Sequence, residues 1–217
     1  MTAVSPTAES QAAVAHEIPE PLRRRAIRLE YFTISWNLLE ALIAIGAGIV
    51  AGSIALVGFG LDSIIETISG VVLLWRLRQR GEFESRADSR ALRIVGLTFF
   101  ALAAYVGYES VRDLWFRQRP EESVVGIILA AVSLVVMPLL GRAKRRVARE
   151  IGSRALAADA METYLCSLLS ATLLAGLLLN GTLGWWWADP VAALVMVAVM
   201  VHEGVEAFRP EEDEEAD

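Results

Sequence analysis

Hydrophobic residues in this chain gather into six long runs, each separated from the next by a short polar segment. An apolar stretch of about 20 residues is long enough to cross the hydrocarbon core of a membrane as an α-helix. The pattern predicts six transmembrane helices, over about residues 30–51, 54–76, 91–115, 122–141, 155–180 and 186–207. These runs use most of the chain, so we expect an all-α, six-helix transmembrane bundle over residues 26–208.

Composition agrees with a membrane protein, since 55% of the 217 residues are hydrophobic and the mean hydropathy is +0.47. The formal net charge of −6 is unevenly placed, because residues 211–217 contain six acids. It therefore gives no indication of nucleic acid as a partner. Residues 1–21 lack the apolar core of a signal peptide, and we expect 1–25 to be a disordered cytoplasmic tail. We expect 209–217 to be a solvated acidic cytoplasmic tail.

The basic residues predict the topology, because Lys and Arg flanking membrane helices concentrate on the cytoplasmic side. Of the 20 Lys and Arg residues, 17 fall in the N-terminal flank, the second and fourth connections and the C-terminal end, and three fall after the third run. Both termini are therefore expected to be cytoplasmic. The three tryptophans at 185–187 are expected at the outer interface. Gly48 and Gly52 form a GxxxG pair, which serves packing within the bundle or contact between two chains.

Five acidic residues lie well inside the apolar runs: Glu40, Asp62, Glu66, Glu109 and Glu162. A charged side chain at the bilayer centre costs about 2.5–3.5 kcal/mol on insertion scales. No basic residue lies at comparable depth along the sequence, so we expect no ion pairs to offset this cost. Protonation or a bound cation then remains as the means of burying these acids.

Helical spacing groups some of these residues. Asp62 and Glu66 are four residues apart, as are Glu162 and Cys166, so each pair lies on one helix face. At 1.5 Å per residue, Glu66, Glu162 and Cys166 lie roughly 12–18 Å from a membrane surface, near the middle of a core about 30 Å thick. Two helices with two donors each would form a four-ligand site. Oxygen and sulfur donors in that number suit zinc, and a thiolate disfavours Mg²⁺ and Ca²⁺.

Other polar residues have open interpretations. Glu40, one turn after Asn37, would relay protons, add a ligand or hydrogen-bond between helices. Glu109 lies near the outer end of its helix, within reach of headgroup water. Cys166, the single cysteine, is a ligand or simply a small buried residue, and it excludes an intrachain disulfide.

Three residues lie near the expected cytoplasmic ends of helices. Asp159 is interpreted as a helix-end or gate residue. His202 and Glu203 lie toward the inner end of the sixth helix, where His202 is a metal or proton ligand or, more simply, solvated.

Two segments are similar to motifs of the cation diffusion facilitator family. Gly60-Leu61-Asp62-Ser63-Ile64-Ile65-Glu66 resembles the family's helix 2 motif, and Ala158-Asp159-Ala160-Met161-Glu162-Thr163-Tyr164-Leu165-Cys166 resembles its helix 5 motif. The segment Gly184-Trp185-Trp186-Trp187-Ala188-Asp189-Pro190 is similar to the start of the family's helix 6. The likeness covers about residues 26–208.

The resemblance implies a homodimeric, proton-coupled exporter of divalent metal in a bacterial inner membrane, with zinc or sometimes iron, manganese, cobalt or cadmium as substrate. By position, the metal site would consist of Asp62, Glu66, Glu162 and Cys166. The family's His or Asp falls on Glu162 and its final Asp on Cys166, which changes the donor set. Only about ten residues follow the last helix, so we expect the family's C-terminal cytoplasmic domain to be missing and dimerisation to rest on the membrane helices.

Alternative functions are a membrane metal sensor or assembly partner without transport, and a proton-coupled exporter of another cation. An enzyme is not expected, because the sequence contains no nucleophile–base pair, phosphate-binding loop or HExxH motif. No prosthetic group is expected either, and the divalent metal is interpreted as substrate.

Overall fold

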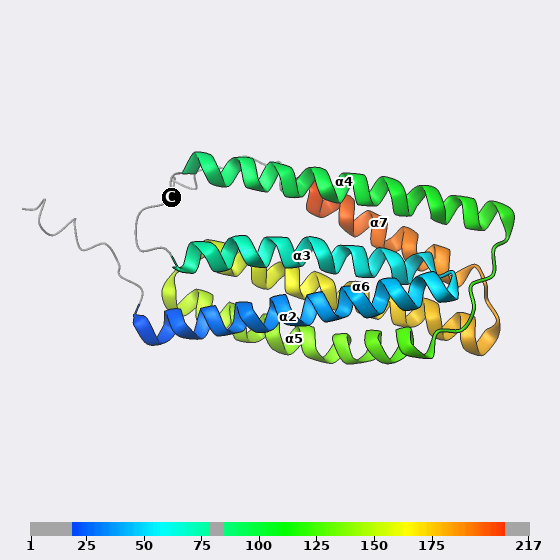
Figure 1. The fold of residues 1–217 in the computed structure, drawn as a ribbon, viewed down its shortest axis with the longest axis horizontal. Helices are drawn as coiled ribbons and strands as arrows, with labels where there is room; N and C mark the ends of the chain where they lie inside the picture. The colour runs from blue at the N-terminus through cyan, green and yellow to red at the C-terminus, as the bar shows by residue number, and fades with distance from the viewer. Residues whose placement is uncertain (1–18, 79–84, 207–217) are drawn as a thin grey trace, which may run out of the picture.

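The structure, a computed structural model, describes residues 19–78 and 85–206, which form helices and connections without strands. The six helices are α2 (Glu20–Ala51), α3 (Ile54–Arg78), α4 (Ser85–Phe116), α5 (Val124–Ile151), α6 (Arg154–Leu183) and α7 (Ala188–Glu206). They lie side by side in one elongated bundle (Figure 1). The predicted all-α, six-helix fold is confirmed.

Short capping sequences explain where several helices begin and end. The Ser123 and Ser153 hydroxyls accept hydrogen bonds from backbone N–H groups of the first turns of α5 and α6. Gly52, Gly152 and Gly184 end α2, α5 and α6 with φ of 64°, 66° and 65°, a left-handed conformation that glycine adopts without a Cβ clash. These caps allow the α2–α3, α5–α6 and α6–α7 connections to take only a few residues, so the helices that they join are antiparallel.

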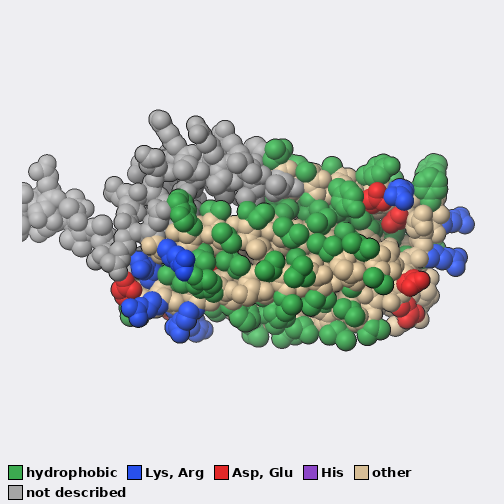
Figure 2. Space-filling view, in the orientation of Figure 1, with side chains coloured by type: hydrophobic (Ala, Val, Ile, Leu, Met, Phe, Trp, Pro, Cys, Tyr) green, Lys and Arg blue, Asp and Glu red, His purple; other side chains and the backbone are tan. Residues whose placement is uncertain are grey.

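Five helices of the described part are long and apolar enough to cross a membrane: α2, α3, α5, α6 and α7. The sixth, α4, has 32 residues, like α2, and lies along the bundle beside α3 and α7 (Figure 1). Hydrophobic side chains cover the middle of the face seen in Figure 2, while Lys, Arg, Asp and Glu side chains gather toward its two ends. This distribution is that of a multi-pass membrane protein.

Most helices extend beyond the predicted spans. The helix predicted to begin at about residue 30 begins at Glu20, and the one predicted to end at about 141 continues to Ile151. The apolar runs predict only the membrane-spanning part of each helix, and polar residues continue the helix beyond that part. The first described residues of α2, the end of α3 and the α5–α6 junction share one end of the bundle (Figure 1). The tails predicted for 1–18 and 207–217 lie outside the described residues.

The helix α3 is central, since it packs against α2, α4, α6 and α7. Its contact with α2 is close because glycines remove side chains from both surfaces. A Cβ at Gly48 would lie 2.8 Å from Val57, and a Cβ at Gly60 would lie 2.7 Å from Ile45. Of the two interpretations of the GxxxG pair, Gly48 therefore serves packing within the bundle, while Gly52 is the helix cap.

Candidate metal centre

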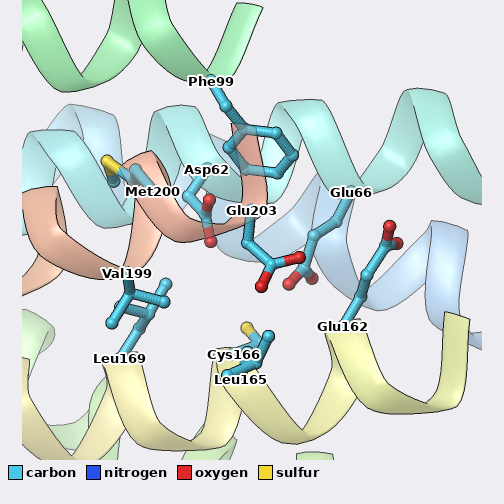
Figure 3. A pocket seen from close by; sticks show the side chains of 10 residues that line it. All are labelled: Asp62, Glu66, Phe99, Glu162, Leu165, Cys166, Leu169, Val199, Met200 and Glu203. Atoms are coloured by element: carbon cyan, nitrogen blue, oxygen red, sulfur yellow. The ribbon is translucent and has the colours of Figure 1, made fainter. Parts of the chain in front are cut away.

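The two acids of α3 point toward α6 and α7, as their four-residue spacing requires (Figure 3). Asp62 is 3% exposed and Glu66 is 9% exposed, so both carboxyl groups are buried. The face of α6 opposite them carries Cys166, which is fully buried. One donor atom from each of Asp62, Glu66 and Cys166 lies within 4.8 Å of the other two.

That spacing is close to what one metal ion requires. Zinc binds oxygen at about 2.0–2.2 Å and sulfur at about 2.3 Å, so two donors of a tetrahedral ion lie about 3.4–3.6 Å apart and never more than about 4.5 Å. Small side-chain movements would bring the three donors of Asp62, Glu66 and Cys166 into one coordination sphere. The structure thus brings together three of the four residues singled out in the sequence.

Glu162 lies beside this group rather than in it. It lines the same pocket one helical turn from Cys166, and its Oε2 accepts a 3.1 Å hydrogen bond from the Ser69 hydroxyl on α3. This bond directs the carboxylate toward the end of α3. A rotation of the Glu162 side chain would be needed to bring it to the other three donors.

The pocket has room for a single small species. Its volume is about 10 Å³, comparable to the space that one water molecule occupies. Besides the donors, its lining comprises the apolar residues Phe99, Leu165, Leu169, Val199 and Met200 and the acid Glu203 on α7. Apolar walls around a few acidic donors exclude water and strengthen the attraction of a cation.

Two side chains of α2 form hydrogen bonds with residues of α3 at the site. Asn37, fully buried, donates a 2.8 Å hydrogen bond from Nδ2 to Glu66 Oε2. Glu40 accepts hydrogen bonds from the hydroxyls of Ser63 on α3, at 2.9 Å, and Ser133 on α5. Among the interpretations open for Glu40, the structure therefore shows hydrogen bonding between helices, and Glu40 is not among the residues that line the pocket.

A buried ion-pair cluster lies between α2, α5 and α6. Lys144 is fully buried, and its Nζ lies 3.2 Å from Glu30 Oε1 and 2.5 Å from Asp159 Oδ2. None of the five acids expected inside the apolar runs belongs to this cluster, so the cluster does not bear on the expectation that they form no ion pairs. In the sequence, Lys144 lies among the arginines of the fourth polar connection. The helix α5 continues through this segment, and its Lys144 side chain is buried inside the bundle.

The same expectation is wrong for Glu109, which forms an ion pair with Arg112 one turn later on α4. Both side chains are partly exposed near the C-terminal end of the helix. No ion pair is formed by Glu40, Asp62, Glu66 or Glu162 within residues 19–78 and 85–206.

The N-terminal ends of α3 and α7 are joined by a polar contact. Asp189, 1% exposed, accepts a 2.5 Å hydrogen bond from the Ser53 hydroxyl and a 3.3 Å bond from the backbone N–H of Ala55. Trp185 and Trp187 stack beside this junction with ring centroids 5.1 Å apart, and both remain over one third exposed. His202, near the other end of α7, is exposed.

The sequence assigned no site role to three residues that line the pocket or bond to its acids, although Asn37 and Glu203 lie near residues it singled out. Ser69 and Asn37 contact acids only through helix packing, and nothing in their local sequence marks them. For Glu203, helical spacing indicates that the side chain faces the bundle. It follows Met196 and Met200 by seven and three residues, so it shares the face on which both methionines are fully buried.

Comparison with known proteins gives a consistent result. Residues 31–211 match the family described as the cation efflux transmembrane domain. Transmembrane protein 163 of Xenopus laevis is 22% identical over 195 residues, 88% of this chain and 69% of that protein. An uncharacterized transporter of Methanocaldococcus jannaschii is 27% identical over 177 residues, 78% of this chain and 62% of that protein.

A further relative is magnetosome protein MamB of Magnetospira sp., 26% identical over 170 residues, 73% of this chain and 57% of that protein. The alignments thus cover between 57% and 69% of the lengths of these three curated relatives.

Proposed function

The chain belongs to the cation efflux family, and from that premise we propose that it carries divalent metal cations across a membrane. The cation binds at Asp62, Glu66, Glu162 and Cys166. The observation that carries the proposal is the convergence of donors from Asp62, Glu66 and Cys166 within 4.8 Å, buried in the bundle. A curated relative named as a transporter supports the same activity.

The donor chemistry favours zinc, with iron second. A thiolate prefers borderline and soft cations, whereas carboxylates alone would suit Mg²⁺, Ca²⁺ or Mn²⁺. Four donors of this kind match the coordination number of zinc. Cys166 is the residue that separates these two classes of ion.

Protons drive the transport in this proposal. Carboxylates and thiols bind metal in their deprotonated forms, so protons and metal compete for the same donors. Metal binds from the cytoplasmic side as protons leave, and the bundle then opens outward. Protons from the more acidic exterior displace the metal, which completes one cycle of efflux.

The working unit is a homodimer in the bacterial inner membrane. One of the relatives above, magnetosome protein MamB, comes from a bacterium, which supports that location. Gly48 is used for packing within the bundle, so the contact between chains lies on other apolar faces of the helices. Cross-linking of the full chain in membranes would show the dimer.

The experiment is zinc flux in vesicles. Full-length protein is reconstituted into lipid vesicles with an acidic lumen that holds a zinc-sensitive dye. Proton antiport predicts that zinc accumulates in the lumen and that a protonophore stops it. Asp62→Ala is expected to abolish the flux, whereas Glu150→Gln, an exposed acid on α5, leaves it unchanged.

If the Asp62→Ala variant carries zinc as fast as the wild type, the proposed metal site is wrong. If the protein binds zinc but carries none across the membrane, metal sensing and not transport is its function. Zinc flux that survives Cys166→Ala at full rate would remove Cys166 from the donor set.

A further inference from the structure

We propose that Glu203 on α7 is a further ligand of the transported metal, so that three helices rather than two hold the ion. This inference rests on the proposed function and extends its donor set. The segments that carry the resemblance to the cation diffusion facilitators place donors on α3 and α6 only. Glu203 lines the same pocket as Asp62, Glu66, Glu162 and Cys166.

The register between α3 and α7 brings Glu203 to the depth of the site. The 2.5 Å hydrogen bond from Ser53 to Asp189 fixes the N-terminal ends of these two helices side by side. Glu66 follows Ser53 by 13 residues and Glu203 follows Asp189 by 14. At 1.5 Å per residue, the two acids lie roughly 20 and 21 Å from the same junction.

The orientation of α7 turns Glu203 inward. Met196 and Met200, seven and three residues earlier on the helix, are both fully buried, and Glu203 is partly buried on the same side. In Figure 3 its carboxylate lies between those of Asp62 and Glu66 and faces α6. Because α7 is short, its C-terminal end lies part of the way along the bundle and does not reach the end of the bundle where α3 ends (Figure 1).

Asp62 gives an independent sign that a cation belongs in this pocket. Its carboxylate is 97% buried and opens into the pocket, and no group of the described residues donates a hydrogen bond to it. The charged groups that act on it are three other acids, Glu40, Glu162 and Glu203. A buried carboxylate without a donor is costly unless a cation compensates it.

Glu203 can complete the donor set while Glu162 stays bonded to Ser69. Asp62, Glu66 and Cys166 supply three donors, while Glu162 is bonded to Ser69 and turned aside. The oxygens of Glu203 lie outside the 4.8 Å group, so ligation requires a rotamer change, for which a glutamate has three rotatable bonds. Glu203 also restores the carboxylate that the family motif would have at position 166.

The test is metal titration of the full chain in lipid nanodiscs, with Zn²⁺, Mn²⁺ and Cd²⁺ as probes. Glu203→Gln keeps the side-chain shape and removes the charge. We expect it to weaken zinc binding by at least on the order of 10- to 100-fold, the loss typical when only an outer-shell partner of a ligand is removed. Mn²⁺ affinity should fall more than Cd²⁺ affinity, because Cd²⁺ depends more on the thiolate.

Two further variants control the measurement. His202→Gln, the exposed neighbour, should bind zinc like the wild type. Glu203→Ala, checked for folding by circular dichroism, should show the same loss as Glu203→Gln. Wild-type affinity in both Glu203 variants would overturn the inference.

The experiment distinguishes a failure of the Glu203 proposal from a failure of the proposed metal site. If the wild type binds zinc and Asp62→Ala abolishes binding while both Glu203 variants bind normally, only the role of Glu203 is wrong. If the wild type binds no zinc, or Asp62→Ala does not alter the binding, the proposed metal site itself is wrong.

Discussion

The Asn37 amide on α2 donates a 2.8 Å hydrogen bond to the Glu66 carboxylate on α3. Because Asn37 is fully buried, water cannot replace this donor if it is removed. Hydrogen bonds of this kind orient a ligand before the metal arrives, and their loss typically costs 10- to 100-fold in metal affinity. The position of Glu66 thus depends on a helix that contributes no ligand to the proposed site.

We therefore predict that Asn37→Ala weakens zinc binding by on the order of 10- to 100-fold, measured by titration calorimetry on the full chain. Thr33→Val is the matched control, since the Thr33 hydroxyl bonds only to the backbone of Leu29 in its own helix. The control should bind zinc like the wild type. Equal affinities for Asn37→Ala and Thr33→Val would show that Glu66 needs no support from α2.

The buried Lys144 makes a second prediction, about stability. Lys144→Met leaves Glu30 and Asp159 buried without their shared cation, and breaking a buried pair costs about 3–5 kcal/mol. We expect a large fall in the unfolding midpoint in detergent. The triple variant Lys144→Met/Glu30→Gln/Asp159→Asn should recover most of the loss, because no charge is then left unpaired.

Arg145→Met, an exposed neighbour on α5, is the control for Lys144 and should unfold like the wild type. If Lys144→Met matched this control, the cluster would contribute nothing measurable to the fold.

The close contact of α2 and α3 makes a third prediction. A Cβ at Gly60 would lie 2.7 Å from Ile45 Cγ1 and 3.0 Å from Ala44 Cβ, so Gly60→Ala must push the helices apart. Overpacking of this kind costs about 1–3 kcal/mol. Since Asp62 is only two residues away, zinc affinity should fall together with the unfolding midpoint.

Gly46 offers a matched comparison on the same pair of helices. A Cβ there meets nothing within 4 Å, so Gly46→Ala should not lower the unfolding midpoint. A Gly60→Ala variant as stable as Gly46→Ala, with unchanged zinc affinity, would mean that the two helices do not need their close approach.

The sequence alone predicted the fold and the α3 and α6 donors well, because both follow from local periodicity. Apolar run lengths determined the helices, and four-residue spacing placed Asp62 with Glu66 and Glu162 with Cys166. The convergence of Asp62, Glu66 and Cys166 agrees with that pattern. Glu162, turned toward Ser69, does not, since a contact with another helix decides its rotamer.

What escaped prediction depends on where helices lie relative to one another. Lys144 looked like a member of a basic connection, and only the continuation of α5 buries it. Glu203 looked like a residue at the membrane surface. Its depth follows from the Ser53–Asp189 contact and from helices that extend past the end of α7 (Figure 1). Neither relation can be obtained from the periodicity of a single helix.

The proposed site consists of one ion shared between Cys166 and the carboxylates, and X-ray absorption at the zinc edge tests that most directly. Zinc bound to the full chain should show one sulfur neighbour at about 2.3 Å with oxygens at about 2.0–2.2 Å. Cys166→Ser should lose the sulfur neighbour, and Asp62→Ala should lose the bound zinc. A wild-type spectrum with only oxygen and nitrogen neighbours, or a sulfur neighbour that persists in Cys166→Ser, would contradict it.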